Sequence, residues 1–382
     1  MNFAPTEEQQ MVKDMVKRFV DEEIKPIAAE LDETHRHPEE ICRKLGEMGL
    51  MGVSVSTDYN GAGMDNVTYV LALTEISRGC ASCGVITSVN NSLYGHPVKT
   101  FGTDEQKKKF LSPVAGGEVE GCYALTESGA GCDAAALKCR AELKGDKYIV
   151  NGVKKFITNG NVARYCVLAA NEDTSKGYKG IINLIVDLEN TPGFTLGTIE
   201  DKMGILASGT AELVFEDAEV PAENLLGKPG DGFRQMMEGL NAGRIGIGCQ
   251  ALGIGRAVLE DSLEYAKERV QFGQSITSFQ AIQWKLADMA TQLDAAEMLL
   301  LKAAWMEDNG YNFEKESAMA KMYASDVAMK AAVEGVQIFG GYGYCKDYPA
   351  ERHMRDAKIC QIYEGTNEIQ RVVIARKLLG AR

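Results

Sequence analysis

The sequence lacks several features that would assign it to a class at once. It has no run of about 18 consecutive apolar residues, the length that a membrane-spanning helix needs. Its first residues carry neither the basic nor the apolar region of a secretion signal. Basic residues are not in excess, because 41 Lys and Arg stand against 54 Asp and Glu and leave a net charge of −13. The missing apolar run predicts no membrane span. Because an acidic surface repels polyanions, we also expect no nucleic-acid partner.

Paired cysteines are also scarce. The ten cysteines among 382 residues are too few and too scattered for a disulfide framework. Only Cys80-Ala-Ser-Cys83 has the CxxC spacing, and no second pair completes a zinc site. We interpret these two as buried free thiols, with a metal or redox role as the alternative. The cysteine usage predicts a thiol-reduced protein of the cytoplasm.

Common catalytic signatures are missing as well. The four histidines include no HExxH, and His35 and His37 fall in a polar stretch that we expect to be a solvated loop, so no metal site is predicted. Neither a GxSxG elbow nor a Walker P-loop is present. The pairs Gly253-Ile-Gly255 and Gly341-Tyr-Gly343 lack the third glycine of GxGxxG. A nicotinamide site of the Rossmann type is therefore not expected.

The length predicts about two or three domains, and the residue pattern divides the chain into three zones. Residues 1–121 are helical in pattern, with capping boxes at Thr6–Gln9 and Thr103–Gln106. Residues 122–230 contain short β-rich runs at 148–157, 165–168, 181–186 and 213–215. Asn151-Gly152 lies inside the first run and predicts a hairpin. Strands without intervening helices indicate an antiparallel sheet or barrel.

The helical period returns in residues 231–382. Six apolar residues recur at alternating steps of four and three, and so share one helix face; they are Ile282, Leu286, Met289, Leu293, Ala296 and Leu300. We interpret this stripe as core of a bundle or subunit interface. The sequence thus predicts an α+β chain in the order α, then β, then α.

Four stretches combine glycines with polar side chains, a composition that a hydrophobic core does not have. They are residues 123–133, 156–160, 337–344 and 362–371. The glycines of the first and third stretches would let a ligand approach the backbone closely. The alternatives are an ordinary loop for the first stretch and an ordinary helix end for the third. Phe156 in the second is suited to stack on a flat ring, or simply to fill a core. Glu364 in the fourth is a candidate general base if it is desolvated, and otherwise a solvated glutamate before a helix.

Together and in this order, the four stretches resemble the acyl-CoA dehydrogenase family, most closely its short-chain, butyryl-CoA branch. Five further segments resemble the same branch: 89–94 (Val-Asn-Asn-Ser-Leu-Tyr), 201–205 (Asp-Lys-Met-Gly-Ile), 243–247 (Gly-Arg-Ile-Gly-Ile), 269–273 (Arg-Val-Gln-Phe-Gly) and 349–353 (Pro-Ala-Glu-Arg-His). The resemblance runs the length of the chain. It implies an N-terminal helical domain, a central antiparallel β-barrel-like domain and a C-terminal four-helix bundle, assembled as a homotetramer.

The resemblance also implies FAD as cofactor, an acyl-CoA or enoyl-CoA substrate and electron-transferring flavoprotein as partner. The expected FAD contacts are Tyr123, Leu125, Thr126, Gly131, Cys132, Phe156, Ile157, Thr158, Arg269, Phe272, Gln280, Gln337, Gly340, Gly341, Thr366, Asn367 and Glu368. Arg269, Gln280 and residues 337–341 are expected to help hold the ADP half, partly across a subunit interface, whereas residues 366–368 are expected to complete the flavin shell. The expected substrate contacts are Cys132, Asn241, Arg244 and Gly365.

In the family's reaction, a carboxylate removes the α-proton of the thioester while the β-hydrogen leaves as hydride to the flavin. Some relatives carry the base in the segment that corresponds to residues 241–244, where this chain has Gly243. The resemblance therefore assigns the base of this chain to Glu364. Butyryl-CoA oxidation to crotonyl-CoA, or the reverse reduction, is the expected activity. A branched, alicyclic or aromatic acyl-CoA is the alternative substrate, and an acyl-CoA oxidase the alternative enzyme.

The chain departs from the family pattern at a few positions. Ser128 and Cys132 replace a proline and a serine of the 123–133 loop, and cysteine is a weak hydrogen-bonding group. Phe156 stands where many members have Trp, and Leu206 where arginine is common. None of these changes removes the base or the glycines.

Overall fold

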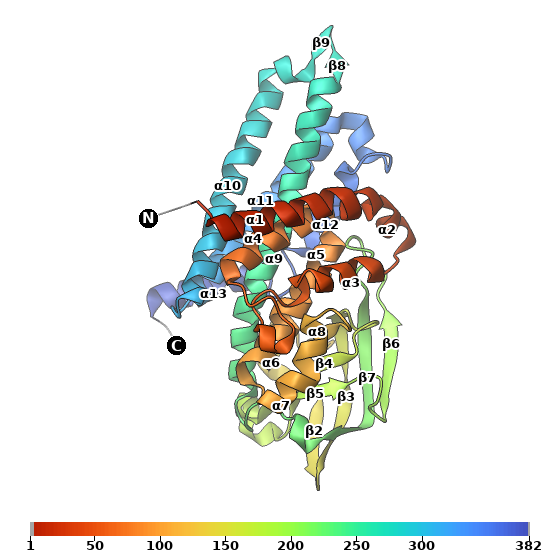
Figure 1. Cartoon of the computed structure of the whole chain (residues 1–382), viewed down its shortest axis with the longest axis vertical. Coiled ribbons are helices and arrows are strands. Elements are labelled where there is room, and N and C mark those ends of the chain that lie inside the picture. Colours follow the sequence, from red (N-terminus) through yellow and green to blue (C-terminus); the bar gives the residue numbers. More distant parts are fainter. Residues whose placement is uncertain (1–3, 381–382) are drawn as a thin grey trace.

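The computed structural model describes residues 4–380 and shows helices at both ends of the chain with a sheet between them (Figure 1). The N-terminal part contains α1 (Glu7–Phe19), α2 (Ala28–Thr34), α3 (Glu39–Glu47), α4 (Asn66–Gly79), α5 (Ala81–Ser88), α6 (His96–Phe101), α7 (Asp104–Gln106) and α8 (Ser112–Ala115). Both predicted capping boxes are confirmed, since Thr6 pairs reciprocally with Gln9 and Thr103 with Gln106. Almost every residue of α4 and α5 is buried, so this pair forms the centre of the helical part.

The middle part is one sheet of seven strands. They are β1 (Gly121–Ala124), β2 (Arg140–Lys144), β3 (Lys147–Thr158), β4 (Tyr165–Asn171), β5 (Ile181–Asp187), β6 (Phe194–Ile199) and β7 (Thr210–Pro221). Their order is β1-β4-β2-β3-β7-β6, with β5 paired to β4. Most neighbours are antiparallel as expected, whereas β4 runs parallel to β1 and to β2. Alternate residues of β4 enter cores on opposite faces, with Cys166 and Leu168 on one and Val167 on the other.

The predicted hairpin at Asn151-Gly152 is wrong. β3 continues through both residues, and the turn that joins β2 to β3 lies at Gly145-Asp146. Gly152 instead occupies a register shift against β7, where an added Cβ would lie 2.7 Å from Cys139 Cα. The glycine therefore serves a close backbone approach inside a strand, which an Asn-Gly pair by itself does not reveal.

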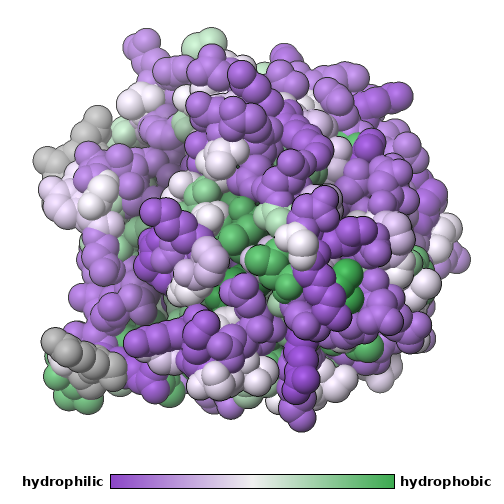
Figure 2. Space-filling model, turned by 90° about the horizontal axis from the view of Figure 1, so that it is seen from below, coloured by the Kyte–Doolittle hydropathy of each residue, from purple (hydrophilic) through white to green (hydrophobic). Residues whose placement is uncertain are grey.

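The C-terminal part consists of α9 (Gly232–Glu268), α10 (Gln280–Asp308), α11 (Glu314–Phe339), α12 (Ala350–Ile359) and α13 (Asn367–Leu379), with a small hairpin of β8 (Val270–Gln271) and β9 (Gln274–Ser275). The predicted stripe lies on α10, where Met289, Leu293, Ala296 and Leu300 are buried in the same core as residues of α4 and α9. None of the helices in residues 4–380 is long and apolar enough to cross a membrane. Seen from below, the surface is mostly hydrophilic around a recessed group of hydrophobic side chains (Figure 2).

Candidate active site

Glu364 lies in the short connection between α12 and α13, and its backbone conformation is unusual. Its φ is 51°, and that of the next residue, Gly365, is 93°. Two consecutive residues with positive φ turn the chain sharply, and a non-glycine residue adopts this region at a conformational penalty that surrounding contacts must offset. The contacts of the following residues supply that support.

Lys321 of α11 is the main support of this connection. Its Nζ donates to the Gly365 carbonyl at 2.8 Å and to Asn367 Oδ1 at 3.0 Å, although the side chain is fully buried. Burial lowers the pKa of this ammonium to about 8. Gln370 adds a donor, since its Nε2 reaches the Gly365 carbonyl at 2.8 Å. Thr366 caps α13 by accepting from the Ile369 N–H.

The carboxylate of Glu364 is held without hydrogen-bonding partners. Its Oε2 is buried and has none, and an added Cβ at Gly243 of α9 would lie only 2.1 Å from it. Burial raises the pKa of Glu364 to about 8, while the positive charges of Lys321 and Arg244 act in the opposite direction. Desolvation of this kind turns a glutamate into a base that titrates close to neutral pH.

Arg244 stands one residue beyond Gly243 and is also buried. Its Nη1 donates to Asn241 Oδ1 at 2.7 Å, whereas its buried Nε has no partner. Burial lowers the pKa of this guanidinium. A cation with a free donor beside an unpartnered carboxylate is suited to hold a polar ligand.

The sheet contributes a second element, the strand end at 123–132. Lys154 Nζ donates to the Leu125 carbonyl at 2.9 Å and to Glu127 Oε1 at 2.8 Å. Glu127 also accepts from the Cys139 N–H at 2.9 Å, and it forms a backbone turn with Ala130. This buried ion pair fixes the strand end, while Gly131 and Cys132 beyond it are exposed.

Phe156 projects from the neighbouring strand at an irregularity. Its φ is 58°, and the register of β3 against β7 shifts between Lys154 and Ile157. The bulge re-aims the side chain, so that Phe156 is 60% exposed while Ile157 is buried in the sheet core. The aromatic face is thus available to a flat ligand.

A third group of expected contacts lies at the other end of the molecule. Figure 1 shows the β8–β9 hairpin at the top and the large sheet at the bottom. Phe272 in the hairpin turn is 93% exposed, and no atom lies within 4 Å of a Cβ added to Gly340 or Gly341. Gln280 and Gln337 are exposed nearby on α10 and α11, and Arg269 stacks over Tyr342. One copy of the chain does not bring this group to Phe156.

Comparison with known proteins agrees with this architecture. The sequence matches the profiles of the acyl-CoA dehydrogenase N-terminal domain over residues 6–118, middle domain over 122–218 and C-terminal domain over 230–379. The chain belongs to the acyl-CoA dehydrogenase family. The fold class and family expected from the sequence are therefore confirmed.

Individual family members are similar over their full length. The short-chain specific acyl-CoA dehydrogenase of Clostridium acetobutylicum is 48% identical, over 99% of this chain and 100% of its own. The structure of butyryl-CoA dehydrogenase from Megasphaera elsdenii matches with a TM-score of 0.97 and 45% identity, covering 99% and 100%. A chain solved in work entitled "Electron transferring flavoprotein of Acidaminococcus fermentans: Towards a mechanism of flavin-based electron bifurcation" has a TM-score of 0.98 and 50% identity, with the same coverage.

Some predicted contacts of this acyl-CoA dehydrogenase chain are restricted by burial. The side chains of Leu125, Ile157 and Asn367 are buried in the protein and are not open to a ligand. Thr126 and Thr158 are half-buried, and Glu368 is exposed. Tyr123 is half-buried with a hydroxyl that lacks a partner.

The sequence reading missed the two lysines that hold the site loops, Lys154 and Lys321. The sequence contains only a weak indication of their role: Lys321 interrupts an alanine-rich helix, and Lys154 precedes a second lysine in a strand. His37 was also misread as solvated. It is half-buried, and its Nε2 lies 2.7 Å from Glu120 Oε1, which ties the segment before α3 to the segment before β1.

Proposed function

We propose that this chain catalyses the FAD-dependent α,β-dehydrogenation of a short-chain acyl-CoA, butyryl-CoA to crotonyl-CoA or the reverse, with Glu364 as the base. The observation that carries the proposal is Oε2 of the Glu364 carboxylate, which is buried and unpartnered beside the bare Cα of Gly243. Glu364 would remove the α-proton of the thioester at Oε2. Because the carboxylate has no hydrogen bond to break, it is free to accept a proton.

The backbone and neighbouring cations would hold the substrate for this step. In its turned conformation, Glu364 offers a backbone N–H for which the structure shows no acceptor, and this group would polarise the thioester carbonyl as an oxyanion-hole donor does. Arg244 and Asn241 would bind polar groups of the substrate, together with Gly365 and Cys132. Bound substrate would exclude water from the reacting carbons and raise the pKa of the base further.

FAD would occupy the surfaces that the sequence predicts for it. The exposed ring of Phe156 would lie against the isoalloxazine, and the 123–132 strand end and Thr158 would supply hydrogen bonds to its edge. Thr366, Asn367 and Glu368 would complete this surface. The ADP half of a second copy's FAD would be held by the group at the far end of the bundle, namely Arg269, Gln280, Gln337, Gly340 and Gly341. FAD, when bound, would accept the β-hydrogen of the substrate as hydride.

The same surface supports an assembly of several copies. Phe272, Tyr344 and Trp284 are 93%, 87% and 64% exposed, and such aromatic side chains at one end favour contact with another subunit. We infer a homotetramer that passes electrons to electron-transferring flavoprotein in the cytoplasm. Light scattering of the purified protein measures the first inference, and reduction of that flavoprotein measures the second.

Anaerobic titration with butyryl-CoA tests the proposed reaction. The flavin absorbance of the native protein should bleach, while Glu364→Gln should keep its FAD and be reduced about 10²–10⁴-fold more slowly, the usual contribution of a general base. Longer, branched and alicyclic thioesters then rank the substrates. A variant that is reduced at the native rate refutes the role of Glu364, and a native protein that ignores butyryl-CoA refutes the short-chain assignment.

A further inference from the structure

The motif Cys80-Ala-Ser-Cys83, which the proposed reaction does not use, lies at the junction of two buried helices. α4 ends at Gly79, and α5 begins at Ala81. Cys80 stands between them in an extended conformation, with φ −154° and ψ 117°, and is the residue that precedes the first turn of α5. Cys83 is the third residue of α5. The first turn therefore brings both sulfurs to the N-terminal end of α5, where the helix dipole stabilises a thiolate.

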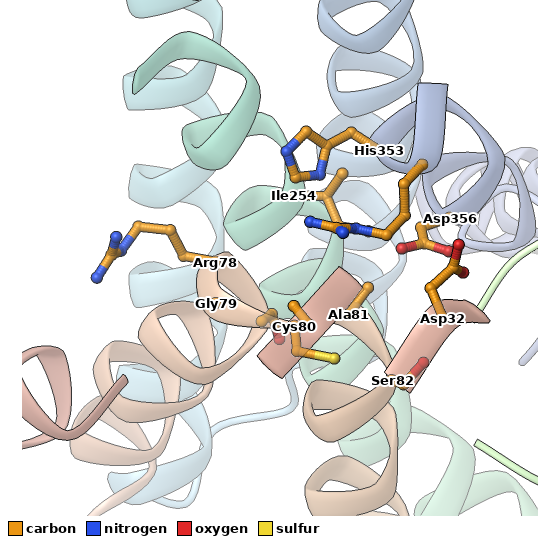
Figure 3. Close-up of a pocket in the computed structure, with 12 residues that line it drawn as sticks. Asp32, Arg78, Gly79, Cys80, Ala81, Ser82, Ile254, His353 and Asp356 are labelled. Atoms are coloured by element: carbon orange, nitrogen blue, oxygen red, sulfur yellow. The ribbon is translucent and has the colours of Figure 1, made fainter. Parts of the chain in front are cut away.

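The two thiols differ in access. Cys80 is half-buried and lines a pocket together with Asp32, His353 and Asp356 (Figure 3). Cys83 is only 1% exposed behind it. An outer thiol with a buried partner is the arrangement in which one cysteine attacks and the other resolves.

Electrostatics distinguish the two thiols in the same sense. The side chain and backbone N–H of Cys83 lower the pKa of Cys80, and Arg352 in the pocket wall lowers it further, against burial and Asp356. Cys80 and burial raise the pKa of Cys83 well above its ordinary value. Cys80 is therefore the better nucleophile of the two.

A second pair of neighbouring cysteines offers an internal comparison. Cys122 of β1 and Cys166 of β4 face each other in register, but both are completely buried. None of the ten cysteines forms a disulfide in the structure. Proximity is thus shared by both pairs, while among these four cysteines only Cys80 is accessible to solvent.

Hydrogen bonds through Gln250 link the turn that carries the motif to Tyr363, the residue before the proposed base. Gln250 of α9 is fully buried, and its Nε2 donates to the Ala81 carbonyl at 2.9 Å. The hydroxyl of Tyr363 donates to Gln250 Oε1. Tyr363 immediately precedes Glu364, so two hydrogen bonds join the first turn of α5 to the loop of the base.

We propose that Cys80 and Cys83 form a reversible redox site, which low-molecular-weight disulfides oxidise to an intramolecular disulfide, and that this oxidation slows the reaction at Glu364 through Gln250 and Tyr363. The second half rests on the proposed function. The Cys80 thiolate attacks one sulfur of the disulfide R–S–S–R, forms a mixed disulfide and releases RS⁻. Cys83 loses its proton and attacks the Cys80 sulfur, which releases the second RS⁻. The two thiol protons end on two RSH, so the protein loses two hydrogens and R–S–S–R is reduced.

Closing the bond changes the geometry of the turn. Cys80 precedes the helix in an extended conformation, and a disulfide would hold its Cβ atom about 3.5–4.5 Å from that of Cys83. The bond would therefore restrain the backbone from Cys80 to Cys83, and this segment includes the Ala81 carbonyl that accepts from Gln250. A shift of this carbonyl would move Gln250 and the Tyr363 hydroxyl bonded to it. We therefore expect flavin reduction to slow by about tenfold, less than the loss of about 10² that a 1 Å misplacement of the reacting group itself would cause.

Peptide mass spectrometry of the holoprotein tests the redox site without reference to activity. Trypsin releases residues 79–99, a peptide with no cysteines other than these two. After incubation with oxidised glutathione and an acid quench, this peptide should have lost two hydrogens, and dithiothreitol should restore them. Cys83→Ser should instead trap one glutathione on Cys80, and Cys80→Ser should trap none. Cys122 and Cys166 should stay reduced in the same digest.

The outcomes separate the two halves of the proposal. If the 79–99 peptide remains a dithiol, or is oxidised only in unfolded protein, the redox site is refuted. If the disulfide forms and butyryl-CoA reduces the flavin at the unchanged rate, the coupling to Glu364 is refuted. A protein that forms the disulfide but never reacts with butyryl-CoA contradicts the proposed function instead and leaves the redox site confirmed.

Discussion

Replacing Gly243 with alanine is a sharp test of the packing around the proposed base. The new Cβ would lie 2.1 Å from Glu364 Oε2 and 2.9 Å from Leu93 Cδ2. Ordinary contact begins near 3.4 Å, so the carboxylate oxygen must retreat by about 1.3 Å. Because a 1 Å misplacement costs about 10² in rate, we expect the rate of flavin reduction by butyryl-CoA to fall about 10²-fold, or about 2.7 kcal/mol.

Stability should change much less than activity in this variant. Overpacking a core usually costs about 1–3 kcal/mol, but both clashing atoms here are the ends of flexible side chains. Replacing glycine by alanine inside a helix returns about 1 kcal/mol. The two effects nearly cancel, so the free energy of unfolding should stay within about 1 kcal/mol of the native value.

Gly239→Ala is the matched control, because it lies one turn earlier on α9 and has no atom within 4 Å of an added Cβ. It should keep native activity and gain about 0.5–1 kcal/mol of stability. Stopped-flow flavin absorbance gives the rates, and urea denaturation gives the stabilities. Native activity in Gly243→Ala, or an equal loss in Gly239→Ala, would refute the proposed position of the base.

Three further outcomes are expected. Since the pKa of Glu364 is raised to about 8 and the base must be ionised, kcat/KM should increase with pH up to about 8 and then level off; a profile that is flat between pH 6 and 9 contradicts this. Lys321→Met removes a charge that lowers the pKa of Glu364, so the midpoint of the same profile should move to higher pH, and an unchanged midpoint counts against the lysine. Lys154→Met leaves the buried Glu127 carboxylate without its cation and should lower the free energy of unfolding by about 3–5 kcal/mol. Adding Glu127→Gln to the same chain should restore part of this loss. Urea denaturation of both variants measures the two effects, and an unchanged stability of Lys154→Met would contradict the prediction.

Local and periodic features of the fold were predictable from the sequence. The capping boxes at Thr6 and Thr103 depend on side chains three residues apart, and the structure contains both. The apolar stripe on α10 follows from helical periodicity, and its last four members are buried. The end of α11 at the Gly340 pair was also visible. These features need no knowledge of distant contacts, because neighbours along the chain supply the interacting groups.

Strand register was not predictable in the same way. The Asn151-Gly152 pair looks like a hairpin turn, but β3 continues because β7 pairs with it along both halves. Pairing with a strand some 60 residues away overrides the turn preference of two residues, since each half of β3 gains hydrogen bonds and core contacts. A similar limit applies to His37, whose partner Glu120 is remote in sequence.

The linear residue pattern was enough to predict the succession of helix, sheet and helix, and it contains a set of motifs that resemble the acyl-CoA dehydrogenase family. The chemical character of those motifs depends on the tertiary structure. Glu364 becomes a candidate base because α9 brings Gly243 to its side and α11 brings Lys321 to its loop, and these residues lie far apart in the chain. Cys80 and Cys83 differ because α5 buries one and leaves the other in a pocket wall. Burial and charge depend on what surrounds a side chain in space, and a linear pattern does not contain that information.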